Sequence, residues 1–200
     1  MKAARQDWFD TQIDLHPDRL VFIDETWAST AMARKRGRAP AGKRLRMGLP
    51  HGHWKTTTFT AGLRSDGVVA PFVMDGPMNR RRFEFYVERV LVPDLRAGDM
   101  VVMDNLSSHK GPAVRRMIEA AGARLLYLPP YSPDFNPIEK ALAKLKALLR
   151  KLEERTVDGL WKAIGELIDE FTPDECQHFF DSSGYEVDTY EPIQSDRKLL

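Results

Sequence analysis

The stretch LVFIDE, at residues 20–25, is an apolar run of strand length that ends on two acids. The same pattern returns in MVVMDN, at residues 100–105, where four apolar residues are followed by Asp104. Short, continuous apolar runs are typical of strands that are buried on both faces of a sheet. Ligands of open α/β sheets usually bind at the carboxyl ends of strands, so we expect Asp24 and Asp104 to lie side by side.

The segments around these two runs predict an α/β fold. Three antiparallel strands come first, at residues 20–23, 54–63 and 68–74, and Ser65, Asp66 and Gly67 predict the turn between the last two. Strands at 100–103 and 124–128 then alternate with helices expected at 79–92, 111–121, 137–154 and 157–170, after a short helix at 3–14. Pro93 is expected to close the helix at 79–92. This order indicates a mixed sheet, antiparallel and then parallel, flanked by helices.

Composition limits the class of protein. The chain has 200 residues, 42% of them hydrophobic, which suffices for one domain with a sizeable core. No apolar window is long enough for a membrane span, and the first residues lack the apolar stretch of a signal peptide, so we expect a cytoplasmic protein without membrane contact. Cys176 is the single cysteine, which excludes a disulfide framework and gives no sign of structural zinc.

A third acid, Glu139, lies at the start of the long helix. Asn136, Pro137 and Glu139 suit the N-cap, N1 and N3 positions of that helix. One interpretation is a capping box, in which Glu139 has no catalytic role. The alternative is that Glu139 joins Asp24 and Asp104. Clustered carboxylates require a cation, and oxygen ligands favour Mg²⁺ or Mn²⁺. Two such ions about 4 Å apart can promote phosphodiester cleavage.

Charge is unevenly distributed along the chain. Residues 1–151 hold 26 Lys and Arg against 16 Asp and Glu, whereas residues 152–200 hold 4 against 13. A basic body can attract a phosphate backbone, although charged surfaces are more often simply solvated. The candidate DNA contacts are the cations of one loop and two on the flank of the long helix beside Glu139, namely Arg34, Lys35, Arg36, Arg38, Lys43, Arg44, Arg46, Lys146 and Arg150. A stripe on the same helix is expected to pack on the sheet and comprises Ile138, Leu142, Leu145, Leu148, Leu149 and Leu152.

Four stretches together resemble the bacterial transposases of the insertion sequence 630 type, members of the Tc and mariner superfamily. They are LVFIDET at 20–26, GRAP at 37–40, VVMDNLSSHK at 101–110 and LPPYSPDFNPIEKALAKLK at 128–146. The 34 residues between Asp104 and Glu139 are a spacing typical of that superfamily. The resemblance implies a ribonuclease H-like fold in which Asp24, Asp104 and Glu139 form a catalytic triad of metal ligands.

The resemblance also implies an activity and partners. The expected reaction is metal-dependent cleavage at transposon ends, followed by attack of the freed 3′-hydroxyl on target DNA, commonly at TA dinucleotides. Relatives act as multimers on DNA, which would place the chain on the bacterial nucleoid. Glu25, Asn105 and His109 fall in the same motifs and are candidates to support the metal ligands. For His109, a structural role early in a helix is the alternative.

The domain organisation follows from the same comparison. We expect a linker helix at residues 1–18, a catalytic domain at 19–155, and a C-terminal helix with an acidic tail at 156–200 packed on that domain. Relatives carry an upstream helix-turn-helix region, so we expect it to be encoded upstream or in a separate frame. Many relatives also have Asn and Trp soon after the Glu, whereas this helix continues as KALAKLK.

Two other functions are consistent with these residues. One is an inactive or regulatory remnant that pairs with a full-length transposase. The other is a stand-alone nuclease of the ribonuclease H type that acts on RNA in hybrids, which the 34-residue spacing and the NPIE sequence at 136–139 disfavour.

Overall fold

A five-stranded mixed sheet forms the centre of the computed structural model, which describes residues 2–48, 51–106 and 109–186. The strand order is β3-β2-β1-β4-β5. β1 pairs antiparallel with β2, which pairs antiparallel with β3, whereas β4 and β5 extend the sheet in parallel with β1. The strands are β1 (Leu20–Ser29), β2 (Thr56–Arg64), β3 (Gly67–Asp75), β4 (Met100–Met103) and β5 (Arg124–Tyr127). The predicted mixed sheet is confirmed.

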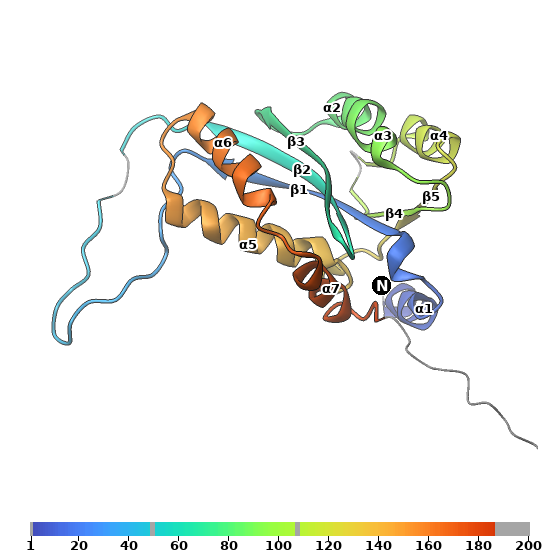
Figure 1. Cartoon of the computed structure of the whole chain (residues 1–200), viewed down its shortest axis with the longest axis horizontal. Coiled ribbons are helices and arrows are strands. Elements are labelled where there is room, and N and C mark those ends of the chain that lie inside the picture. The colour runs from blue at the N-terminus through green and yellow to red at the C-terminus, as the bar shows by residue number, and fades with distance from the viewer. Residues whose placement is uncertain (1, 49–50, 107–108, 187–200) are drawn as a thin grey trace, which may run out of the picture.

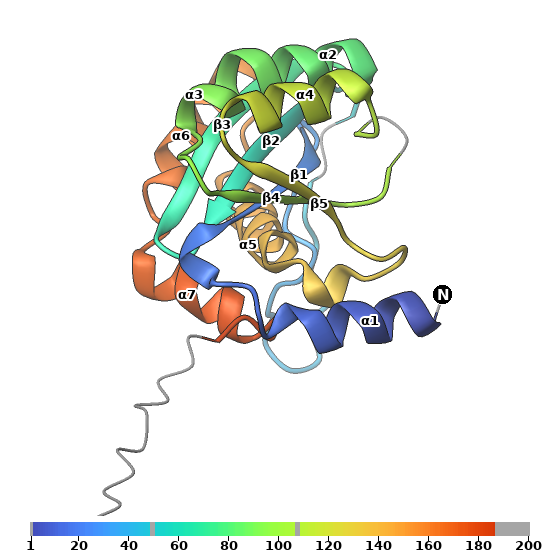
Figure 2. The ribbon, with the colours of Figure 1, turned by 90° about the vertical axis from the view of Figure 1, so that its right-hand side faces the viewer.

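Helices cover both faces of this sheet (Figures 1 and 2). On one face lie α2 (Arg80–Tyr86), the π-helical turn η2 (Val87–Leu91), α3 (Val92–Asp94) and α4 (Pro112–Ala120). The other face carries α5 (Pro137–Leu152), α6 (Val157–Ile168) and α7 (Pro173–Asp181). α1 (Lys2–Gln12) and the short 3₁₀ turns η1 (Pro17–Arg19) and η3 (Pro133–Phe135) complete the described elements. None of the described helices has the length and apolar character that a membrane crossing would need.

The first strand shows why its sequence is continuously apolar. Successive side chains of a strand point to opposite faces of the sheet. Leu20 and Phe22 belong to the core under α5, α6 and α7, whereas Val21 and Ile23 belong to the core under α2 and α4. All four are buried because both faces of the sheet are covered.

β1 does not end at Ile23 as predicted. Its parallel partner β4 stops at Met103, opposite Ile23, but its antiparallel partner β2 follows it as far as Ser29. Asp24 therefore lies inside a strand rather than after one. The prediction failed because the polar residues that follow the apolar run remain paired with β2.

Pro93 also does not close the helix that begins at Arg80. The N–H of Val92 bonds to the carbonyl of Val87, which makes a π-helical turn, and the helix then runs on to Asp94. Pro93 lies at the start of α3, directly after this π-helical turn. Phe83, Val87 and Leu91 of this helical segment are buried in the core.

The C-terminal part of the chain corrects two further predictions. Leu152 is 49% exposed and does not join the predicted packed stripe, and Glu153 then ends α5 in a left-handed conformation (φ 56°). α7 was not predicted, although Thr172 and Pro173 are a recognisable helix start. α7 brings Phe180 against Phe22, with ring centroids 5.4 Å apart. Of the predicted acidic tail, residues 187–200 lie outside the described residues.

Candidate active site

Strand register places Asp24 and Asp104 beside each other. Ile23 and Met103 are the last pair between β1 and β4, and each is followed by an aspartate. Glu139 lies in the first turn of α5, on the sheet face toward which Asp24 points. Asp104 and Glu139 line one pocket of about 530 Å³. The structure thus brings together the three acids that the sequence singled out.

The electrostatics of Asp24 show that these acids influence one another. Asp24 is 8% exposed, and burial together with the negative charges of Glu139, Asp104 and Glu25 raises its pKa to about 7. A hydrogen bond from the N–H of Glu25 to Asp24 Oδ1, 2.7 Å long, acts in the opposite direction. A nearby cation would further stabilise the ionised form of this buried carboxylate, which has three other acids close to it.

Asn136 begins α5 as predicted, but its side chain does not cap the helix. Its amide nitrogen donates instead to Asp24 Oδ2 at a distance of 3.0 Å. The capping-box interpretation of Asn136 and Glu139 is therefore wrong. A capping box therefore does not explain why a glutamate stands at position 139.

His109 links Asp104 to Glu25. Its Nδ1 lies 2.6 Å from Asp104 Oδ1, and its Nε2 lies 2.8 Å from Glu25 Oε2. The imidazole is fully buried and stacks on Phe83, with centroids 4.2 Å apart. Burial by itself would lower the pKa of His109, but hydrogen bonds to the two carboxylates outweigh it and raise the pKa to about 9. His109 lies in a turn before α4, so the expectation that it sits early in a helix is wrong.

The position of Glu25 in β1 explains how its carboxylate reaches His109. Asp24 points toward α5, and Glu25, next along the strand, points to the opposite face, where His109 and Phe83 lie. Asn105 lines the pocket beside Asp104, and its Oδ1 is buried without a hydrogen-bond partner among the described residues. Ser107 and Ser108, from the same sequence motif, fall outside the described residues.

Sequence comparison assigns the chain to a family. A family model described as DDE superfamily endonuclease matches residues 19–160, which contain all three acids. The chain belongs to the DDE endonuclease superfamily. No match was found among curated protein sequences.

Solved structures similar to this DDE endonuclease agree in fold. A Mos1 transposase paired-end complex with the left transposon end has a TM-score of 0.70 at 19% identity, over 91% of this chain and 57% of that one. A mariner Mos1 paired-end complex with Mg has a TM-score of 0.71 at 18% identity, over 91% and 57%. The catalytic domain of Mos1 mariner transposase has a TM-score of 0.65 at 17% identity, over 91% and 85%.

These similarities establish the ribonuclease H-like fold of the DDE endonuclease. They also show how much of each similar structure this chain covers. The chain spans little more than half the length of the transposase chains in the paired-end complexes, but most of the separate catalytic domain.

The acids of the DDE endonuclease suit a hard divalent cation. Within the described ranges, no group of three or more His, Cys, Asp or Glu side chains could hold a metal ion by itself. Mg²⁺ rarely uses such a cage, since it is usually bound by one or two carboxylates together with substrate phosphates and water. Burial and the repulsion of the neighbouring acids raise the pKa of Asp24, and a bound cation would offset that repulsion. Asp24, Asp104 and Glu139 therefore fit as ligands.

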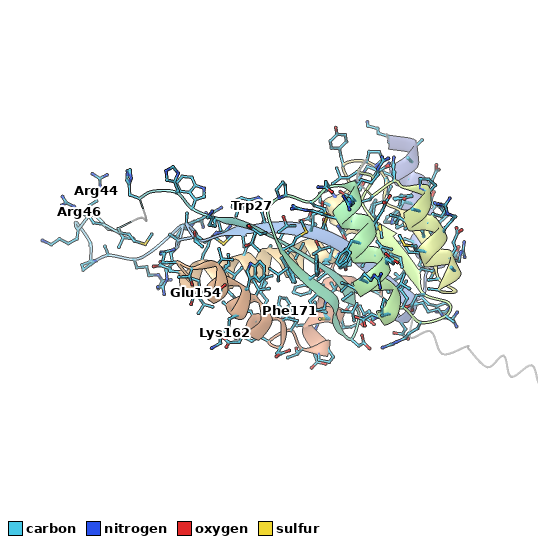
Figure 3. The ribbon with its side chains drawn as sticks, turned by 90° about the horizontal axis from the view of Figure 1, so that it is seen from above. Trp27, Arg44, Arg46, Glu154, Lys162 and Phe171 are labelled. Carbon is cyan, nitrogen blue, oxygen red and sulfur yellow. The ribbon has the colours of Figure 1, made fainter. Side chains whose placement is uncertain are left out.

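The predicted DNA-contacting cations separate into groups. Arg34, Lys35 and Arg36 line a pocket of about 430 Å³ together with Arg150. Lys146 lies 5.1 Å above the Trp27 ring and lines a groove with Glu139. The remaining loop cations are not brought to the acids. Figure 3 shows the outermost of them far from the sheet, and the group comprises Arg38, Lys43, Arg44 and Arg46.

Proposed function

We propose that this chain is the catalytic part of a DNA transposase, which cleaves DNA at transposon ends and joins the freed 3′-hydroxyl to target DNA. The observation that carries the proposal is the meeting of Asp24, Asp104 and Glu139 at one edge of a ribonuclease H-like sheet. Family membership supports a nuclease chemistry. Motifs of the insertion sequence 630 type, and similar structures described as complexes of Mos1 transposase, support transposition.

The three acids would serve as metal ligands. When bound, two Mg²⁺ or Mn²⁺ ions would activate the attacking oxygen and stabilise the leaving oxygen of the phosphodiester. One of the similar structures is described as a complex with Mg, which supports this choice of cation. The contribution of the chain is to hold Asp24 and Asp104 on adjacent strands and Glu139 on a rigid helix, so that little reorganisation is needed during the reaction.

Three neighbouring residues would support these ligands. His109 holds one oxygen of Asp104, and Glu25 holds the far side of the same imidazole. Asn105 would supply a polar wall to the pocket beside Asp104. Such supporting residues commonly tune metal affinity and activity by about 10- to 100-fold.

The basic surface near α5 would bind the DNA backbone. Arg34, Lys35, Arg36 and Arg150 gather around one pocket, and Lys146 lines a separate groove together with Glu139. The cations nearer the tip of the loop would reach DNA or a second protomer away from the acids. TA-containing target sites and a homo-oligomer assembled on DNA belong to the same proposal.

The rest of the domain organisation follows. Residues 1–18 would be a linker helix before the catalytic domain at 19–155, and the described part of residues 156–200 would pack on that domain. The protein would act in the bacterial cytoplasm, on the nucleoid.

Nicking of a supercoiled plasmid tests this function. The chain should nick plasmid in Mg²⁺ or Mn²⁺ but not in EDTA, and Asp104→Asn should abolish nicking. Asp10→Asn, which changes an exposed acid on α1, is the matched control and should have no effect. Nicking that survives Asp104→Asn would refute the assignment, and cleavage confined to RNA:DNA hybrids would favour a ribonuclease instead.

A further inference from the structure

The side chain of Asn136 is bonded unlike that of a helix-capping asparagine. A capping side chain accepts a hydrogen bond from the second or third N–H of its helix. Asn136 occupies the N-cap position of α5 with an extended backbone (φ −112°, ψ 93°), yet it makes no such bond. Its Nδ2 donates across to β1, to Asp24 Oδ2. Helix capping therefore does not account for this side chain.

Asn79 provides the comparison within the same chain. It occupies the N-cap position of α2, and its side-chain oxygen accepts a hydrogen bond from the N–H of Arg82 at 3.0 Å. Asn79 and Asn136 share residue type and helix position but differ in what their amides bind. The difference lies in the carboxylate of Asp24, which only Asn136 faces.

Asn136 connects two of the three acids. Its backbone carbonyl accepts the N–H of Glu139 at 3.2 Å, while its amide donates to Asp24 at 3.0 Å. An ionised carboxylate can only accept hydrogen bonds, so the amide has to present its NH₂ group. That orientation leaves Asn136 Oδ1 buried with no partner among the described residues. The orientation of the Asn136 amide therefore satisfies Asp24 with a hydrogen bond but leaves the amide oxygen without one.

The turn before Asn136 is fixed by contacts from α1 and from the segment after α7. Arg5 of α1 donates to both oxygens of Asp134, at 2.9 and 2.7 Å, and its guanidinium lies 4.8 Å from the centre of the Phe135 ring. The hydroxyl of Tyr185, after α7, donates to the carbonyl of Phe135 at 2.9 Å. Asn136 itself is 3% exposed. A side chain fixed in this way can determine the orientation of its partner.

We propose that Asn136 is a positioning residue that fixes the Asp24 carboxylate for binding of a divalent cation. This inference rests on the proposed function, since it requires Asp24 to be a metal ligand. Asn136 acts through Asp24 and does not itself contact the ion or the DNA. Loss of its amide lets the Asp24 carboxylate rotate, which weakens cation binding without weakening the helix.

Matched substitutions separate positioning from capping. Serine and glycine are both good N-cap residues but cannot reach Asp24, so Asn136→Ser and Asn136→Gly remove the amide and keep a capping residue. Asn79→Ser makes the same change at the capping asparagine. Mn²⁺ binding to the 200-residue chain is measured by titration calorimetry, and thermal unfolding in EDTA reports on folding.

The expected result is a Kd for Mn²⁺ that rises about 10- to 100-fold in both Asn136 variants. Asn79→Ser should leave that Kd unchanged, and the unfolding midpoints of the Asn136 variants should fall no further than that of Asn79→Ser. An unchanged Kd in a folded Asn136→Ser or Asn136→Gly variant would overturn the inference while leaving the proposed function intact. Absence of Mn²⁺ binding to the unsubstituted chain, or equal binding by Asp104→Asn, would instead overturn the proposed function itself.

Discussion

Nδ1 of His109 lies 2.6 Å from Oδ1 of Asp104, so a fully buried ring fixes one oxygen of that carboxylate. We expect His109→Ala to lower the rate of plasmid nicking by about 10- to 100-fold, because Asp104 then loses its orientation. His178→Ala, at an exposed histidine of α7, should leave the rate unchanged. Equal nicking by His109→Ala and the unsubstituted chain, with both folded, would show that the bridge has no part in the reaction.

Asp24→Asn should stabilise the protein while abolishing its activity. The pKa of Asp24 is raised from 3.8 to about 7, so its ionised form costs stability above pH 7 in the absence of a cation. That cost shrinks as the pH falls below 7 and the group becomes protonated. In EDTA we expect the unfolding midpoint of Asp24→Asn to exceed that of the unsubstituted chain at pH 8, and the difference to shrink at pH 5. A lower midpoint at pH 8 would contradict the cost of burying Asp24 as an anion beside the other acids.

Arg64, at the end of β2, and Asp99, just before β4, form a buried ion pair. Two hydrogen bonds, 3.0 and 2.6 Å long, join side chains that are 2% and 4% exposed. Asp99→Ala should lower the free energy of unfolding by about 3–5 kcal/mol, because it leaves the Arg64 charge buried and unpaired. Urea unfolding at pH 7 measures this. A loss below about 1 kcal/mol, the value typical of exposed pairs, would mean that water reaches Arg64.

The same pair predicts a loss of stability in acid. Burial by itself would raise the pKa of Asp99, but the hydrogen bonds from Arg64 and from the N–H of Arg96 outweigh it and hold the pKa below 3.8. A lowered carboxyl pKa contributes stability above the unfolded-state pKa and loses it as the pH falls through the folded-state pKa. Between pH 5 and pH 2, unfolding free energy should therefore fall more steeply for the unsubstituted chain than for Asp99→Asn. Parallel curves would exclude this contribution.

Replacement of Arg34, Lys35 and Arg36 by alanine should weaken DNA binding through phosphate contacts. Each lost contact should make the slope of log affinity against log salt less steep by about 1. Fluorescence anisotropy with one duplex over a salt series measures the slope. Lys162→Ala, at an exposed lysine of α6 that does not line this pocket, is the control and should keep the original slope. An unchanged slope in the triple variant would remove this pocket from the DNA surface.

The sequence by itself determined the succession of strands along the chain, the two-sided burial of LVFI and MVVM, and the presence of an acid at the end of each run. These features depend on side-chain alternation and on neighbours a few residues apart, so a local pattern carries them. The recognisable motifs also carried the family. The length of β1 and the presence of α7 were not predicted, because distant partners, β2 and the Phe22 face, stabilise them.

Only the tertiary structure decided how the acids are held. Asn136 has the sequence signature of a helix cap, yet its amide binds an aspartate 112 residues away. His109 could be singled out by its motif, but its bond to Glu25 joins residues 84 apart. A polar side chain bonds to whichever donor or acceptor packing places within about 3 Å of it, and packing is set by both cores and both chain ends together. Sequence therefore located the acids, and the fold selected the residues that orient them.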